Sequence, residues 1–200
     1  KLIGLNKEQQ ENFYAGKDKK IQHHNFCKIL TRVLKENFGV DLAQEEICSL
    51  IYEYHKIARG YTRLYPDVAE TLVRLKEKYI LSVASYTQGC FTKFELIELG
   101  IDKYFSYFVY TSDIGFHKAT PKFYERCLEI VRGKAENCVM VGDNYDVDIL
   151  VPQKLGLKTV WVKNPLTASQ YIHMFTQEPK DMINLAEFAK LPEVIERIFN

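Results

Sequence analysis

The sequence predicts an α/β protein, with a doubly wound parallel sheet, helices on both faces and a small inserted α-helical cap. Short runs rich in Val, Ile and aromatic residues alternate with segments whose apolar residues recur at helical spacing. The runs are almost continuously apolar, which is typical of parallel strands covered on both faces. Two helix-like segments interrupt this alternation near the start of the chain, and they predict the cap.

The composition is that of a folded protein with a sizeable core. The chain has 200 residues, of which 46% are hydrophobic and 26% are charged. Because 27 Lys and Arg balance 26 Asp and Glu, we expect neither nucleic acid nor a membrane as partner. The five cysteines are widely spaced and form no C-x-x-C pair, so we expect reduced thiols and a cytoplasmic location. Nothing in the sequence predicts an oligomeric state.

Five short apolar runs are the predicted strands of the sheet. They are "KLIGL" (1–5), "YILSVAS" (79–85), "YFVYTS" (107–112), "CVMVGD" (138–143) and "KTVWVK" (158–163). Helical spacing predicts the helices that connect or follow them, at 67–77, 88–99, 121–131, 146–155 and within 167–200. Pro121 suits a first helical turn, whereas Gly100 and Gly156 suit positions just after a helix.

The segment 20–59 differs from the rest because it holds two helical stripes without a strand between them. The first stripe ends at Gly39 and the second at Gly60, and the stretch Asp41–Gln44 resembles a capping box. We therefore expect residues 1–15 and 61–200 to form the α/β core and residues 16–60 to form the helical cap.

Polar residues cluster where the predicted strands end. In open parallel sheets, ligands bind beyond the carboxyl ends of the strands. The residues expected at this edge are Asn6, Ser85, Tyr86, Lys118, Asp143, Asn144 and Asp148. Oxygen donors suit a hard divalent cation such as Mg²⁺, and a lysine with a hydroxyl suits an anion such as phosphate. A bound cation would remove the repulsion between neighbouring acids, which explains why the sequence groups them here.

Four segments make this pattern specific to one family. They are "LYPDVAETLVRLKEKY", "ILSVAS", "GFHKATPKFYERCLE" and "VMVGDNYDVDILVPQKLGLKTVWV". In order and spacing they resemble the haloacid dehalogenase-like (HAD) hydrolases over residues 64–163, and we expect the resemblance to extend to the cap. The resemblance implies that Asp143, Asp148 and Asn144 hold Mg²⁺, and that Ser85, Tyr86 and Lys118 bind a small phosphorylated substrate.

The resemblance also implies a catalytic Asp-x-Asp on the first strand, which the sequence does not contain. Catalysis in this family proceeds through a phospho-aspartate on the first Asp, with the second as general acid/base. The segment "KLIGLNKEQQ" places Asn6 at the nucleophile position and Glu8 at the general acid/base position. The Asn6 amide cannot form an acyl phosphate, and the Glu8 carboxylate reaches one methylene further than that of aspartate.

Three explanations of this departure are left open. In the first, this alignment of the strand is wrong, or residues are missing near a chain start that reads Lys1 rather than Met. In the second, an otherwise working site carries a substitution. In the third, the protein is non-catalytic and binds a phosphorylated ligand or a protein. The first two predict a Mg²⁺-dependent phosphatase of a small metabolite. A receiver or nucleotide-binding α/β domain is disfavoured by the helical insertion and the lack of a Gly-rich phosphate loop.

Overall fold

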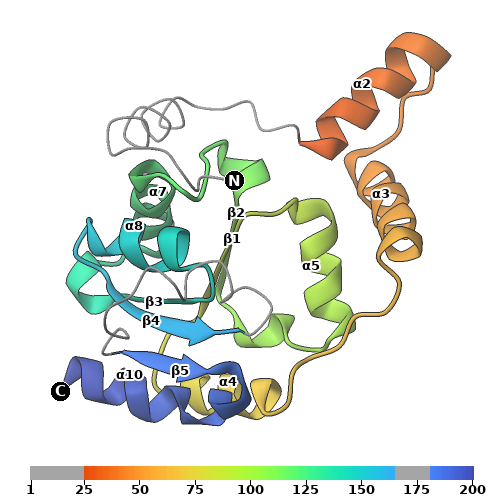
Figure 1. Ribbon diagram of the computed structural model, residues 1–200. Coiled ribbons are helices and arrows are strands. Elements are labelled where there is room, and N and C mark those ends of the chain that lie inside the picture. The colour runs from red at the N-terminus through yellow and green to blue at the C-terminus, as the bar shows by residue number, and fades with distance from the viewer. Residues whose placement is uncertain (1–24, 165–180) are drawn as a thin grey trace, which may run out of the picture.

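The computed structural model describes residues 25–164 and 181–200 (Figure 1). Over these residues, helices alternate with parallel strands, which confirms the predicted α/β class. The expected first strand at 1–5 lies outside the described residues, as do Asn6 and Glu8. None of the helices in the described part is long and apolar enough to cross a membrane.

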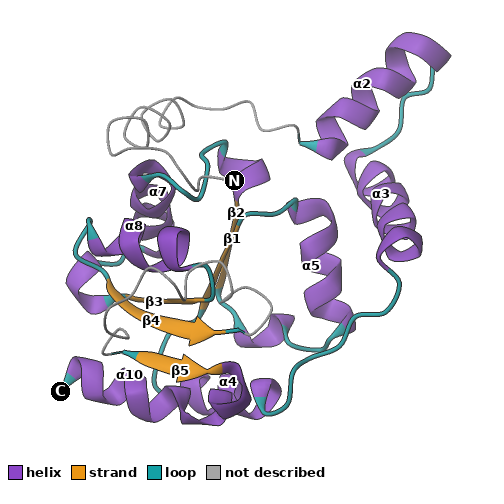
Figure 2. Ribbon diagram, viewed as in Figure 1, coloured by secondary structure: helices purple, strands orange, loops and turns teal. Residues whose placement is uncertain are grey.

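The described strands form two parallel sheets (Figure 2). The strands are β1 (Ser82–Ser85), β2 (Tyr107–Tyr110), β3 (Val139–Gly142), β4 (Lys158–Lys163) and β5 (Met182–Asn184). β1 pairs with β2 and places Ser85 opposite Tyr110, while β4 lies between β3 and β5 and places Trp161 opposite Gly142. β1 therefore ends at the predicted site residue Ser85, and β3 ends at Gly142, directly before the predicted site residue Asp143.

Helices cover the three-stranded sheet on two sides, as Figure 1 shows. α4 (Val68–Lys76) and α10 (Leu191–Phe199) lie on one side, and α7 (Pro121–Val131) and α8 (Val151–Gln153) lie on the other. α5 (Gly89–Glu98) and α6 (Thr111–Ile114) follow β1 and β2 of the two-stranded sheet. Short 3₁₀-helical segments occupy Asp102–Tyr104, Ala135–Asn137 and Leu185–Lys190, and a π-helical segment occupies Tyr145–Leu150. Val160 and Val162 of β4 pack with Leu75 and Ile195 on one face, whereas Trp161 packs with Ile149 on the other. This alternation is what buries a strand on both faces.

The predicted helical hairpin is present as α2 (Phe26–Phe38) and α3 (Gln44–Arg59). Gly39 follows α2 with φ 65°, a left-handed conformation that glycine adopts without steric cost. The capping box expected at Asp41–Gln44 was wrong, because α3 begins directly after Ala43. Glu46 accepts a hydrogen bond from the Ala43 N–H at 2.8 Å. Ala43 has no side-chain oxygen that could accept the reciprocal hydrogen bond from the Glu46 N–H, so only half of a capping box is formed.

The hairpin packs against α5 of the α/β part. Cys27, Ile47 and Ile51 form a buried cluster that Phe91 of α5 joins. The His55 ring stacks on Phe91 with 4.1 Å between centroids. Apolar burial therefore holds the hairpin to α5.

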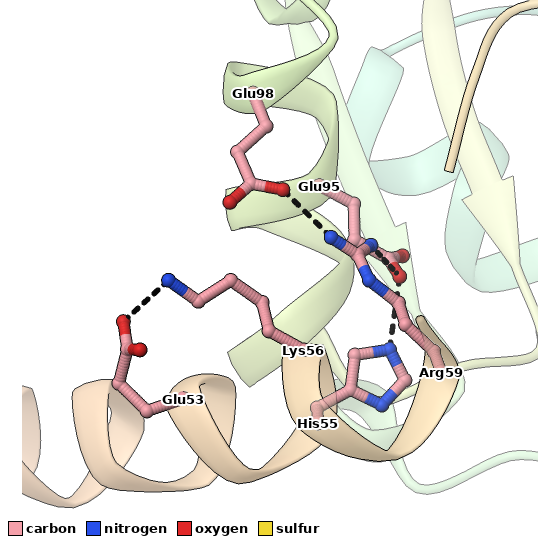
Figure 3. Close-up of polar contacts among 6 residues, drawn as sticks. All are labelled: Glu53, His55, Lys56, Arg59, Glu95 and Glu98. Atoms are coloured by element: carbon pink, nitrogen blue, oxygen red, sulfur yellow. Dashed lines mark hydrogen bonds and ion pairs between the residues drawn. The ribbon is translucent and has the colours of Figure 1, made fainter. Parts of the chain in front are cut away.

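Polar contacts at the end of α3 add to this packing (Figure 3). Arg59 reaches Glu95 at 2.5 Å with one terminal nitrogen and Glu98 at 2.6 Å with the other. His55 Nε2 lies 2.9 Å from the same Glu95 carboxylate. The Arg59 side chain is only 15% exposed, so this pair is more protected from solvent than an ordinary surface ion pair.

The C-terminal region departs in part from the helix predicted within 167–200. α10 is present, with Pro192 in its first turn, but residues 182–184 form strand β5. Three residues carry too little periodicity to distinguish a strand from a helix. Pairing with Trp161, Val162 and Lys163 of β4 decides their conformation.

Replacing Arg59 by alanine should loosen the hairpin, since Glu95 and Glu98 lose their shared cation. We expect the free energy of unfolding to fall by about 1–2 kcal/mol. The matched control is Glu53→Gln on the same helix, whose side chain is 64% exposed and pairs with Lys56 at i,i+3. Urea unfolding should show a lower free energy of unfolding for Arg59→Ala alone. An equal decrease in the two variants would contradict this account.

Candidate active site

Two predicted site segments follow directly from strand ends. Ser85 is the last residue of β1, and Gly142, which Asp143 and Asn144 follow, is the last of β3. Lys118 lies in the loop between α6 and α7. The structure brings Lys118, Asn144 and Asp148 into direct contact, while Ser85 and Tyr86 come from the neighbouring sheet.

A buried ion pair joins Lys118 to Asp148. Lys118 Nζ lies 2.9 Å from Asp148 Oδ1, and the two side chains are 11% and 6% exposed. The second carboxylate oxygen accepts a hydrogen bond from the Asn144 N–H at 3.2 Å. Charges this well buried are stable only when paired, so each of these two residues requires the other.

The glycine before Asp143 is required by the fold of this turn. A Cβ added at Gly142 would overlap the Asp148 carboxyl group, which folds back over the end of β3. The Asp148 N–H also donates to the Asn144 carbonyl at 2.6 Å. The spacing of Gly142, Asp143 and Asp148 therefore has a steric reason as well as a chemical one.

Two residues that the sequence analysis did not assign to the site hold Asp143. Trp161 of β4 donates its indole N–H to the Asp143 carbonyl at 3.0 Å. Asn164 donates to Asp143 Oδ2 at 3.4 Å. Its position directly after a predicted strand was the signal that could have identified it.

The π-helical segment after β3 has its own support. Asn144 Oδ1 accepts from the Val147 N–H at 3.3 Å, and the Tyr124 hydroxyl donates to the Val147 carbonyl at 2.8 Å. Burial raises the pKa of Tyr124, which keeps this hydroxyl protonated as a donor. Burial also raises the pKa of Asp146, the third acid of the segment.

An aromatic pair lies beside Lys118. The rings of Tyr86 and His117 have centroids 4.4 Å apart, and Tyr86 is half exposed. His117 Nδ1 accepts from the Ala119 N–H at 3.0 Å, and its carbonyl accepts from the Thr120 hydroxyl at 2.7 Å. These bonds fix the loop that carries Lys118.

Comparison with known sequences identifies the family. The family model for haloacid dehalogenase-like hydrolases matches residues 2–162. The chain belongs to this family. The resemblance found in the four sequence segments is thereby confirmed, although the type of its helical insertion is not.

Among curated HAD-like relatives, two archaeal glyceraldehyde 3-phosphate phosphatases match part of the chain. The protein of Methanothermobacter thermautotrophicus is 29% identical over 143 residues, which is 71% of this chain and 63% of that protein. The protein of Methanopyrus kandleri is 31% identical over 133 residues, with 66% and 57% covered. The chain thus spans less than two thirds of these relatives' length.

Solved HAD-like structures share the fold. The HAD phosphatase from Thermococcus onnurineus is 21% identical with a TM-score of 0.56, over 94% of this chain and 80% of that one. The 2-haloacid dehalogenase from Pseudomonas syringae is 22% identical with a TM-score of 0.58, over 98% and 83%. At these identities the likeness concerns the fold alone.

The donor set of this HAD-like chain fits a hard cation only in part. Residues 25–164 and 181–200 contain no group of three or more His, Cys, Asp or Glu side chains arranged to hold a metal ion. The Asp148 oxygens lie 2.9 Å from Lys118 Nζ and 3.2 Å from the Asn144 N, whereas Asp143 Oδ2 accepts a longer bond of 3.4 Å from Asn164, so Asp143 is the better placed carboxylate. Mg²⁺ commonly takes one or two carboxylates and completes its shell with water and substrate oxygens, so the residues present are compatible with it.

Removing the lysine charge tests the buried pair. Lys118→Met should lower the free energy of unfolding by about 3 kcal/mol, because Asp148 stays buried without its cation. Lys122→Met is the control, since Lys122 pairs with Glu125 at 2.7 Å and its side chain is 52% exposed. Thermal and urea unfolding in metal-free buffer should show a larger decrease in the free energy of unfolding for Lys118→Met than for the control. A decrease of less than about 1 kcal/mol for Lys118→Met would contradict a buried pair.

Proposed function

We propose that this protein is a Mg²⁺-dependent phosphatase of a small phosphorylated metabolite. The observation that carries the proposal is the buried Lys118–Asp148 pair beside Asp143, at the carboxyl edge of a parallel sheet. The relatives named as phosphatases support the reaction class, since glyceraldehyde 3-phosphate and phosphoglycolate are both small phosphate monoesters.

Each predicted residue has a role that its position supports. The Lys118 ammonium would neutralise negative charge on the phosphate, and Asp148 holds that ammonium in place. The Ser85 hydroxyl, at the end of β1, would donate to a phosphate oxygen, and Tyr86 would border the substrate. Asp143, with Asn144 and Asp148, would hold Mg²⁺, which supplies charge neutralisation when bound.

The hairpin would act as a cap over this edge. We infer that residues 16–60 form the cap and that residues 1–15 and 61–200 form the catalytic core. The contacts of Arg59 and His55 with Glu95 would set the position of the cap relative to α5 (Figure 3). The five cysteines are free thiols, which supports a cytoplasmic location.

The first strand decides between catalysis and binding alone. Asn6 and Glu8 lie outside the described residues, so their placement is a proposal from sequence. If Asn6 stands at the nucleophile position, the chain retains the groups that bind phosphate but lacks the carboxylate that attacks it. This is the observation that favours a non-catalytic binder as the second candidate.

Hydrolysis of p-nitrophenyl phosphate by the full-length gene product tests the proposal. We expect turnover that requires Mg²⁺ and is lost in Asp143→Ala, because that variant removes the best placed metal ligand. Asp146→Asn is the matched control from the same segment, and it should keep most of the activity. No turnover, combined with a melting temperature that rises with Mg²⁺ and phosphate, would overturn the phosphatase in favour of the binder.

Restoring the missing carboxylate tests the alignment of the first strand. If Asn6 occupies the nucleophile position, Asn6→Asp should raise turnover by about 100-fold or more, since loss of a nucleophile costs at least that much. Asn25→Asp, at the start of α2, is a control that makes the same chemical change elsewhere. An unchanged rate in Asn6→Asp would show that Asn6 is not at the reacting position.

A further inference from the structure

Three of the five cysteines gather where α2, α3 and α5 meet. Cys27 of α2 is 3% exposed, and Cys48 of α3 and Cys90 of α5 are half-buried around it. The Cys27 and Cys48 sulfur atoms are 3.0 Å apart. The proposed catalytic chemistry uses none of these thiols.

The geometry suits a covalent link better than a metal. The described residues contain no metal-holding group of three or more donors, so these thiols do not form one. A disulfide has an S–S distance of about 2.05 Å, so the two sulfur atoms need to approach by only about 1 Å. Both cysteines belong to the cluster through which α2 packs against α3, where side-chain rotation can supply that movement.

We propose that Cys27 and Cys48 are a redox modification site, which a hydroperoxide converts into a disulfide joining α2 to α3. The Cys48 thiolate attacks the peroxide, the O–O bond breaks, and Cys48 sulfenic acid forms with release of water or alcohol. The Cys27 thiol then attacks that sulfur, the S–O bond breaks, and hydroxide leaves with the Cys27 proton as water. The two thiols lose two electrons in total, and the peroxide gains them.

The surroundings of the two sulfur atoms support this order. Cys48 is the more exposed of the pair, so peroxide reaches it first. The Gln44 side-chain amide lies 3.4 Å from Cys48 Sγ and can donate to a thiolate there. Burial raises the pKa of Cys27, which disfavours its thiolate and makes Cys27 the resolving thiol rather than the entry point.

The link would stiffen the hairpin without touching the strand-end site. Cys27 and Cys48 are 21 residues apart, so the disulfide closes most of α2, the connecting turn and the start of α3 into one loop. Constraining a loop of this size lowers the entropy of the unfolded chain. The inference does not depend on the proposed phosphatase activity and is tested without it.

Thiol counting on the whole protein tests the proposal. The protein is treated with hydrogen peroxide, unfolded, and labelled with N-ethylmaleimide. We expect five labels on the reduced protein and three after oxidation, because five cysteines are present and two enter the link. Peptide mapping should find Cys27 joined to Cys48, dithiothreitol should restore five labels, and the melting temperature of the oxidised form should be about 5 °C higher.

Two variants distinguish this pair from the other thiols. Cys48→Ser should keep all four remaining labels after oxidation. Cys138→Ser, a control at a half-buried cysteine outside the hairpin, should fall from four labels to two. Five labels on the oxidised wild-type protein would overturn the proposal, and so would a mapped link that contains Cys90, Cys127 or Cys138. The peptide map of the wild-type protein needs no substitution, so the outcome does not depend on variant folding.

Discussion

The buried ion pair between Lys118 and Asp148 is the interaction on which the site depends. It joins the loop before α7 to the segment after β3, and neither charge could stay buried without the other. The pair also places a cation and a carboxylate at the same strand end. Asp143 directly follows β3, at an edge where parallel strands leave room for a ligand.

The surrounding structure is arranged to hold that pair. Gly142 leaves space for the Asp148 carboxylate, Asn144 donates to it, and Tyr124 supports the π-helical segment that carries it. Trp161 belongs to β4 and holds the Asp143 backbone, so the sheet itself positions the acid. The hairpin is attached elsewhere, through α5, by apolar burial and the Arg59 pairs. Site and hairpin are therefore supported by separate sets of contacts.

Much of this arrangement could be predicted from the sequence because it depends on local patterns. The helix at 121–131 and the strand at 158–163 have the predicted bounds, since each has strong periodicity and clear end signals. Strand-end placement predicted Lys118 and Asp148 at the same edge, but it did not predict the ion pair between them. Strand β5 and the roles of Trp161 and Asn164 depend on pairing and side-chain contacts between distant segments, which periodicity does not encode. The π-helical winding at 145–150 is likewise set by tertiary contacts.

The central claim is that this strand end binds a divalent cation through Asp143. Isothermal titration calorimetry of the full-length protein with Mg²⁺, in the presence of inorganic phosphate, tests it most directly. The account predicts that Asp143→Asn weakens Mg²⁺ binding by about tenfold or more, since it removes a charged ligand, while Asp146→Asn stays close to wild type. Equal weakening by both variants, or no Mg²⁺ binding by the wild-type protein, would contradict it.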